Sequence, residues 1–182
     1  MKLTIEIKYR RDLGKLLDYF VLPRKAAEVG VAEGRFSLEM HKWDLDELYL
    51  VDIWENVPFI EGCGSFEQSW HDKNYNNVKE QFKDDKNVLI MKGFSHKMAQ
   101  LIPDNSLGIV YLDGDHTYAG VKADIQVWWS KLVEGGIMGF HDYKNPTYGV
   151  MRAVTEHMGG EQNINILEED GKIENIGAWV KK

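Results

Sequence analysis

The stretch from Leu107 to Tyr143 constrains the fold of this 182-residue chain more than any other part of the sequence. It reads as an apolar strand that ends at Asp113, an amphipathic helix, and a second apolar strand that ends at His141 and Asp142. Neighbouring parallel strands end at the same edge of a sheet, and ligands bind at that edge in open α/β sheets. The stretch therefore predicts that acidic and imidazole groups far apart in the chain share one site.

The remaining chain repeats this alternation of short apolar runs and helical patterns. We expect strands at 26–31, 48–51, 88–91, 107–112 and 137–140, helices near 13–20, 35–42, 75–82, 96–101, after 118 and after 145, and a hairpin of 165–168 with 175–180. This order is typical of a doubly wound α/β domain with an antiparallel C-terminal hairpin. We expect one domain over residues 1–182, in which 1–24 form an N-terminal covering segment that begins as a short strand or an arm.

Three local features set the expected boundaries. The apolar face of the helix after residue 118 includes Trp128 and Leu132, and the helix is expected to stop at Gly135-Gly136. Asn145 and Pro146 are expected as the N-cap and first turn of the next helix. Residues 55–75 show no periodicity, which predicts a long lid or binding loop.

Composition excludes several classes of function. The 22 Lys and Arg residues against 29 Asp and Glu give a net charge of −7, which argues against binding to nucleic acid or to anionic membranes. No apolar run reaches the ~20 residues of a membrane span, and the N-terminus lacks the apolar centre of a signal peptide. The single cysteine, Cys63, cannot form an internal disulfide, which fits a reducing compartment. We expect a cytoplasmic protein with a small-molecule partner; the sequence leaves a homo-oligomer open.

A glycine turn follows the first expected strand. Gly30 and Gly34 allow backbone to approach a ligand closely, although their spacing is not that of dinucleotide binders. Glu28 and Glu33 flank the turn, and nearby anions disfavour a pyrophosphate but not a sulfonium or ammonium group. The turn favours a cationic nucleoside as ligand, with tight strand–helix packing as the alternative.

Candidate nucleoside contacts also follow the second and third strands. Asp52 lies roughly 20 residues beyond the glycine turn, where an acid binds ribose hydroxyls in such folds; a cap or turn role is the alternative. Trp54 is placed to flank an adenine, although tryptophan is more often simply packed. Gly93 and Ser95 either satisfy adenine edge groups or begin the next helix, with Ser95 as N-cap.

At these positions the sequence resembles the class I S-adenosylmethionine-dependent methyltransferases, and among them the small branch related to macrocin-type sugar and catechol-type O-methyltransferases. The resemblance is carried by AEVGVAEGRFS, YLVDIW, MKGFSH, YLDGDHTYAGVKADI and LVEGGIMGFHDY. It implies a Rossmann-like methyltransferase fold: a mostly parallel seven-stranded sheet whose last strand is antiparallel, with S-adenosyl-L-methionine across the point where strand order reverses.

The resemblance also implies roles for individual residues. Gly30 and Gly34 would lie under the methionine moiety, Ser37 near its carboxylate, Asp52 at the ribose, and Ser95 and His96 at the adenine. The full set of cofactor-binding candidates is Glu28, Gly30, Gly34, Ser37, Asp52, Trp54, Gly93, Ser95, His96 and Asp113.

In metal-dependent relatives an acid ends the fourth strand and an acid pair ends the fifth. Asp113 matches the first acid and Asp142 the second member of the pair, whereas His141 replaces the first member. This departure puts both the presence and the identity of a metal in question. Asp113 and Asp142 suit Mg²⁺, whereas His141 shifts the preference towards Mn²⁺, Fe²⁺ or Zn²⁺.

The expected reaction is O-methylation of a small sugar, polyol or phenol. A divalent ion such as Mg²⁺ would lower the pKa of the acceptor hydroxyl, and Asp113, Asp115 and His116 are the catalytic candidates, with Asp115 or His116 as general base. Two alternatives stay open. One is a metal-independent N- or O-methyltransferase with His116 or His141 as base; the other is a nucleoside-binding, metal-dependent hydrolase built on the same acids and imidazoles.

Overall fold

The computed structural model describes residues 5–58, 66–168 and 176–182. The elements in chain order are η1 (Arg10–Gly14), α1 (Lys15–Phe20), β1 (Lys25–Val29), α2 (Arg35–His41), β2 (Glu47–Asp52), α3 (Gln68–Gln81), β3 (Val88–Lys92), α4 (Ser95–Ala99), β4 (Leu107–Leu112), α5 (Tyr118–Trp129), β5 (Leu132–Phe140), α6 (Val150–Met158), η3 (Glu161–Asn163), β6 (Asn165–Ile166) and β7 (Ala178–Lys181).

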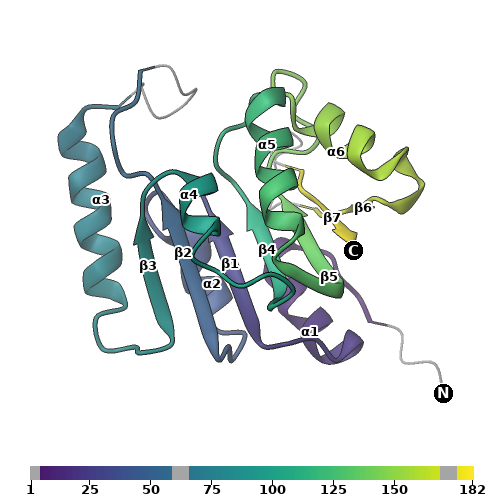
Figure 1. The fold of residues 1–182 in the computed structure, drawn as a ribbon, viewed down its shortest axis with the longest axis horizontal. Coiled ribbons are helices and arrows are strands. Elements are labelled where there is room, and N and C mark those ends of the chain that lie inside the picture. Colours follow the sequence, from purple (N-terminus) through teal and green to yellow (C-terminus); the bar gives the residue numbers. More distant parts are fainter. Residues whose placement is uncertain (1–4, 59–65, 169–175) are drawn as a thin grey trace.

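The strands form one seven-stranded sheet in the order β3-β2-β1-β4-β5-β7-β6 (Figure 1). Strands β1 to β5 are parallel, and β7 is antiparallel to both of its neighbours, β5 and β6. The expected doubly wound, mostly parallel seven-stranded sheet is therefore confirmed. Strand order reverses at the β1–β4 pair, so a ligand-binding crevice is expected beyond the carboxyl ends of these two strands.

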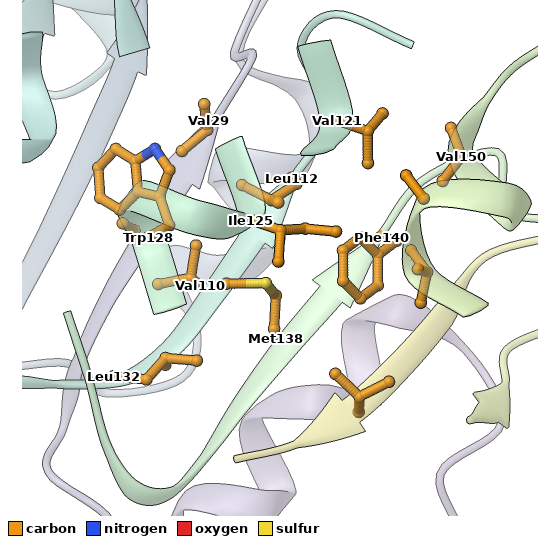
Figure 2. Close-up of a cluster of buried hydrophobic side chains, with 14 of the residues drawn as sticks. Val29, Val110, Leu112, Val121, Ile125, Trp128, Leu132, Met138, Phe140 and Val150 are labelled. Carbon is orange, nitrogen blue, oxygen red and sulfur yellow. The ribbon is translucent and has the colours of Figure 1, made fainter. Parts of the chain in front are cut away.

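One face of the sheet is covered by α4, α5 and α6. Figure 2 shows Val121, Ile125 and Trp128 of α5 packed over Val110 and Met138 of the sheet. All five side chains are buried, and burying each one contributes roughly 1.5–3 kcal/mol. Trp128, which helical spacing placed on a core-facing side, belongs to this core.

The other face is covered by η1, α1, α2 and α3. Leu13, Leu16 and Leu17 of the N-terminal segment are almost fully buried against this face, with Phe36 of α2 and Val78 of α3 in the same cluster. The expected helix near residues 13–20 is therefore present, divided into η1 and α1. Residues 5–8 form neither helix nor strand, and residues 1–4 lie outside the described part of the chain.

The helix after residue 118 is shorter than expected. It ends at Trp129, and Leu132 is the first residue of β5, where it pairs with Leu107. Gly135 and Gly136 lie inside this strand, and the β4–β5 register shifts beside them. The expected helix stop at this glycine pair is wrong, because glycine in a strand also marks such an irregularity.

Two other boundaries differ from expectation. Helix α3 begins at Gln68, so the expected irregular stretch of 55–75 is shorter than its sequence suggested. The buried positions of α3 include polar residues such as His71 and Asn74. The helix therefore lacks the regular spacing of apolar residues by which a sequence predicts a helix. Asn145 does not cap a helix; its side chain accepts a hydrogen bond from Thr147 N–H, and α6 begins only at Val150.

The C-terminal hairpin is present as the antiparallel pair of β6 and β7. Residues 169–175, which connect the two strands in sequence, lie outside the described residues, as does Cys63. Within residues 5–58, 66–168 and 176–182, none of the helices combines the length and the apolarity needed to cross a membrane.

Candidate active site

A cavity of about 460 Å³ opens at the carboxyl ends of β1, β2, β3 and β4. Its volume is within the usual range of small-molecule sites. Among the predicted site residues, those that line it are Gly30, Asp52, Gly93, Ser95, His96, Asp113, Asp115 and His116. The parallel sheet thus brings together groups that lie up to 86 positions apart, from Gly30 to His116.

Gly30 is required by a close approach of two loops. Its φ is +91°, and a Cβ at this position would lie 2.1 Å from the carbonyl oxygen of Asp113 and 2.5 Å from the Gly114 nitrogen. The Gly30 N–H donates to the Val51 carbonyl, and the Asp113 N–H donates to the Val29 carbonyl. Gly30 therefore lets the loops after β1 and β4 meet at the floor of the cavity.

Asp52 holds the glycine turn in place. One carboxylate oxygen accepts the N–H groups of Val31 and Ala32, each at 2.8 Å, and the other accepts Trp54 N–H at 2.7 Å. Burial raises the pKa of Asp52, although these backbone donors oppose the shift. A carboxylate has about four acceptor positions, so Asp52 keeps about one for a ligand, where both ribose hydroxyls were expected to bind.

Three other predicted cofactor residues do not line the cavity. Glu28 and Ser37 are buried under the opposite face of the sheet, where the Ser37 hydroxyl donates to Glu28. Burial raises the pKa of Glu28 to about 8, despite this hydrogen bond. Gly34 is the N-cap residue of α2 and faces Val78 and Gln81.

Trp54 is likewise a core residue. It has no exposed surface, its indole N–H donates to the Ala32 carbonyl, and its ring packs against Tyr75. In this arrangement the Trp54 ring has no face free for an adenine.

The loop after β3 is fixed by a hydrogen-bond relay that the sequence did not reveal. The Trp128 indole N–H donates to the Ser95 hydroxyl at 2.8 Å, and this hydroxyl donates to Asp124 at 2.5 Å. Asp124 also lines the cavity, and burial raises its pKa to about 6, with the charge of Asp115 adding to the shift. The relay positions Ser95 and His96 at the cavity wall.

The loop after β4 begins helix α5. Asp115 accepts Thr117 N–H at 2.8 Å, and the Thr117 hydroxyl accepts Gly120 N–H as the N-cap. A Cβ on Gly120 would lie 2.2 Å from the Asp115 carboxyl carbon, so this glycine makes room for the acid. Thr117, and not His116, caps the helix, which leaves the His116 side chain available for another role.

The four side chains of Asp113, His116, His141 and Asp142 converge beside the cavity. His116 Nε2 lies 3.4 Å from Asp113 Oδ1 and 3.5 Å from Asp142 Oδ2. His141 Nδ1 lies 3.2 Å from Asp113 Oδ1 and 3.1 Å from Asp142 Oδ2. We call these four residues the β4–β5 cluster. Ligand atoms of Asp113, His116 and His141 lie within 4.8 Å of one another, close enough to hold one metal ion.

Within residues 5–58, 66–168 and 176–182, three buried atoms of the β4–β5 cluster have no hydrogen-bond partner: His116 Nε2, His141 Nδ1 and Asp142 Oδ1. Burial lowers the pKa of His141, but its contact with Asp142 and the charge of Asp113 raise it by more. The Arg10 guanidinium lies 3.7 Å from the other oxygen of Asp113, Oδ2. A buried polar group without a hydrogen-bond partner costs folding free energy. The cluster is therefore suited to bind a ligand or an ion that supplies the missing partner.

The charges around the cavity have one sign. Four carboxylates line it, from Asp52, Asp113, Asp115 and Asp124, and among the described lining residues there is no lysine or arginine. Such a wall attracts a cation and repels a phosphate.

Aromatic residues that received no role from the sequence also line the cavity. Phe66 and Trp70 are stacked with their ring centroids 4.2 Å apart, His71 lies beside them, and the Tyr148 ring packs on His116. Their positions depend on where α3 begins and on how the segment before α6 folds back. No local sequence pattern gives either.

Comparison with known proteins agrees with this geometry. Residues 27–143, more than half of the chain, match the family described as "Methyltransferase domain". A curated relative, the uncharacterized protein y4gI of Sinorhizobium fredii, is 28% identical over 142 residues. That match covers 75% of this chain but spans only 15% of the length of y4gI.

Among solved structures, the O-methyltransferase NovP superposes with a TM-score of 0.67 at 17% identity, over 94% of this chain and 77% of NovP. SMU.1697c from Streptococcus mutans, solved in complex with S-adenosylhomocysteine, gives a TM-score of 0.64 at 13% identity, over 97% of this chain and 99% of the other. At such identities the likeness establishes the fold.

Proposed function

The chain belongs to the class I S-adenosylmethionine-dependent methyltransferases, and from this premise we propose that it methylates a hydroxyl group of a small sugar, polyol or phenol. The observation that carries the proposal is the acid-lined cavity at the carboxyl ends of the parallel strands. Its carboxylates would attract a positively charged methyl donor. They would also lie close enough to an acceptor hydroxyl to take up its proton.

The cofactor half of the proposal is supported by the fit of a sulfonium nucleoside. S-adenosylmethionine supplies a methyl group on a positively charged sulfur, which the four carboxylates of the lining favour. Gly30 lines the cavity with backbone alone, which lets this ligand approach the main chain closely. Asp52 would offer its remaining acceptor position to the ribose, and Ser95 and His96 would border the adenine.

The acceptor half is supported by the β4–β5 cluster and the adjacent Asp115. In the reaction the acceptor oxygen bonds to the methyl carbon, the carbon–sulfur bond breaks with its electron pair remaining on sulfur, and the hydroxyl proton passes to a base. Asp115 has one carboxylate oxygen beyond the one that accepts Thr117 N–H, so it can receive that proton. Phe66, Trp70 and Tyr148 supply apolar surface that excludes water from the acceptor.

We further propose that the reaction is metal-assisted. Asp113, His141 and Asp142 would hold a divalent ion. Asp113 and His141 belong to the group whose ligand atoms lie within 4.8 Å of one another, and such an ion would satisfy the buried His141 Nδ1, which has no hydrogen bond among the described residues. When bound, the ion would lower the pKa of a hydroxyl beside it.

A metal-independent N- or O-methyltransferase is the second candidate. It is favoured by the position of His116 in the cavity lining, where this imidazole could accept the proton directly. Family membership favours both of these functions over the nucleoside hydrolase that the same acids and imidazoles would also allow.

A transfer assay tests the proposal. The protein is incubated with S-adenosylmethionine carrying a ¹³C-labelled methyl group and a panel of sugars, polyols, phenols and amines, with and without a chelator. If an acceptor oxygen is labelled without the chelator but not with it, the metal-assisted function is supported. If labelling is the same with the chelator, the second candidate is supported. No labelled product from any acceptor, with breakdown of nucleosides or esters instead, would refute methyl transfer.

A further inference from the structure

The donor atoms of the β4–β5 cluster form a closed ring in which oxygen and nitrogen alternate. The order is Asp113 Oδ1, His116 Nε2, Asp142 Oδ2 and His141 Nδ1, with successive distances of 3.4, 3.5, 3.1 and 3.2 Å. Three segments supply these atoms: the end of β4, the loop before α5 and the end of β5. The ring is therefore a product of the tertiary fold.

Short charged hydrogen bonds do not account for this ring. Charged N–H···O hydrogen bonds are usually about 2.7–2.9 Å long, and each of the four distances is longer. Among the described residues, neither His116 Nε2 nor His141 Nδ1 has a hydrogen-bond partner of good geometry, although both atoms are buried. The imidazole nitrogens thus face the carboxylates at ion-pair distance and not in short hydrogen bonds.

The distances do match the edges of a coordination sphere. With metal–ligand bonds of about 2.0–2.2 Å, neighbouring ligand atoms lie about 3.0 Å apart in an octahedron and about 3.4 Å apart in a tetrahedron. The observed range of 3.1–3.5 Å between neighbouring atoms falls on these values. The set whose ligand atoms all lie within 4.8 Å of one another consists of Asp113, His116 and His141, and Asp142 joins it through its contacts with the two imidazoles. Two carboxylates and two neutral imidazoles also carry a charge of −2, which a divalent cation balances.

Asp113 is oriented for this purpose by Arg10. The guanidinium lies 3.7 Å from Asp113 Oδ2, the oxygen that is not part of the ring, and packs over the Phe36 ring. Asp113 Oδ1 is therefore the oxygen that faces both imidazoles. A contact of this kind fixes the orientation of a ligand before the metal arrives.

We propose that His116 is the fourth ligand of a His₂Asp₂ site, together with Asp113, His141 and Asp142, and that this site selects a transition metal such as Zn²⁺, Fe²⁺ or Co²⁺ over Mg²⁺. Imidazole nitrogen suits these metals, whereas Mg²⁺ takes oxygen ligands and retains several waters. The inference deepens the metal-assisted function proposed above and rests on that function only for the role of the ion in catalysis.

One consequence concerns the base. A His116 whose Nε2 binds a metal cannot accept the acceptor proton through that atom, so this task passes to Asp115. The neighbouring residues of one loop then divide the work: Asp113 and His116 hold the ion, and Asp115 faces the acceptor.

Metal titration of the tag-free protein tests the proposal without any cofactor. Co²⁺ is added to protein stripped of metal while its visible d–d absorption is recorded, and Zn²⁺ and Mg²⁺ are then added as competitors. We expect one Co²⁺ per chain, displacement by Zn²⁺, and affinity for Mg²⁺ at least 100-fold weaker. His116→Asn should weaken Co²⁺ binding at least 10-fold and shift the absorption band, because one nitrogen ligand is lost.

Two controls make the result decisive. His41→Asn removes an imidazole that pairs with Asp85 on the far side of the molecule, and should bind Co²⁺ like the parent protein. If metal-free His116→Asn melts at a lower temperature than the parent, Asp142→Asn is titrated instead and should also lose affinity.

The proposal is overturned if the parent protein binds neither Co²⁺ nor Zn²⁺, if Mg²⁺ competes on equal terms, or if a folded His116→Asn retains full affinity. Calorimetry with S-adenosylhomocysteine on the same metal-free protein separates the two claims. Cofactor binding without metal binding refutes the metal site alone, and metal binding without cofactor binding refutes the methyltransferase function.

Discussion

The two halves of the cavity differ in how far the chain satisfies its own polar groups. On the β1–β2 side, Asp52 accepts three backbone N–H groups. Glu28, which β1 buries under the opposite face of the sheet, accepts the Ser37 hydroxyl, so each acid has a partner within the fold. On the β4–β5 side, buried atoms of His116 and His141 find no hydrogen-bond partner in the described part of the chain. The first half is complete before any ligand binds, whereas the second is completed by what it binds.

The difference teaches where rigidity and chemistry reside. A turn held by internal hydrogen bonds presents backbone to a cofactor without reorganising, which is the advantage of a preformed site. Groups left without partners are costly to folding and are retained where they serve a function. Mutations on the β1–β2 side should therefore affect mainly stability and cofactor binding, and those on the β4–β5 side mainly turnover. The following predictions run from the largest effect to the smallest.

Gly30→Val should cause the largest loss. A side chain here meets the backbone of Asp113 at 2.1 Å and must adopt a φ of +91°, so the loops of the two halves cannot both keep their positions. We expect the free energy of unfolding in urea to fall by about 4 kcal/mol or more, a magnitude typical of severe backbone and packing conflicts.

Gly159→Ala is the matched control. It has φ of +67° but no atom within 4 Å of a new Cβ, so only the backbone conformation is penalised, by about 1–2 kcal/mol. Equal losses for the two variants would contradict the close approach of the β1 and β4 loops.

Asp113→Ala should abolish turnover with little loss of stability. Its carboxylate belongs to the half that the fold leaves incomplete. Removing it takes away one charged neighbour from Arg10, from His116 and from His141. We expect the transfer rate to fall at least about 100-fold, measured with saturating cofactor, and the melting temperature to stay within a few degrees. Unchanged activity on an identified acceptor would refute a catalytic role for Asp113.

Glu28→Gln should change how stability depends on pH. The folded-state pKa of Glu28 is about 8, whereas the group has 4.5 as its ordinary value, so between these limits the folded chain holds a proton that the unfolded chain has released. The free energy of unfolding therefore falls as pH rises from about 4.5 to about 8, by on the order of 2 kcal/mol once relaxation around a buried charge is allowed for.

Glutamine has no proton to lose, so Glu28→Gln should flatten this decline. Urea unfolding at several pH values compares the two proteins. If the free energy of unfolding depends on pH in the same way in both proteins, Glu28 is ionised in the folded state. The proposed difference between the two halves would then be weakened.

Asp52→Asn should weaken cofactor binding moderately. An amide keeps one acceptor oxygen but turns an NH₂ group towards either Trp54 N–H or the N–H groups of Val31 and Ala32. We expect about a 10-fold loss of affinity for S-adenosylhomocysteine by calorimetry, which corresponds to about 1.4 kcal/mol. An affinity equal to that of the parent would mean that Asp52 neither shapes the turn nor meets the ligand.

Asp124→Asn should have the smallest effect. The amide can still accept the Ser95 hydroxyl, but the charge at the end of the relay from Trp128 is lost. We expect about a 3-fold loss of affinity for S-adenosylhomocysteine. If Asp124→Asn loses more affinity than Asp52→Asn, the main polar contact with the cofactor lies on the β3 side of the cavity and not at Asp52.

Much of this architecture follows from the sequence. The strands were predicted because short apolar runs recur with acids or glycines at their ends, and parallel pairing then brings Asp52 and Asp113 to one edge. Strand boundaries at buried runs such as Leu107–Leu112 agree with prediction because every residue of that strand is buried.

What the sequence did not reveal depends on the direction of side chains. Neighbouring residues in a strand face opposite sides of the sheet, so Glu28 is buried away from the cavity that Val29 lines. The convergence of His116 with His141 depends on the path of the loop before α5, and Asp124 meets Ser95 only through helix packing. Such contacts join residues 25 to 29 positions apart and leave no local pattern.

Calorimetric titration of the metal-free protein with S-adenosylhomocysteine tests the account most directly. We predict one binding site per chain with a dissociation constant on the order of micromolar, or about −8 kcal/mol, because the β1–β2 half is complete without a metal. The absence of binding heat from a folded protein at several temperatures would contradict the account.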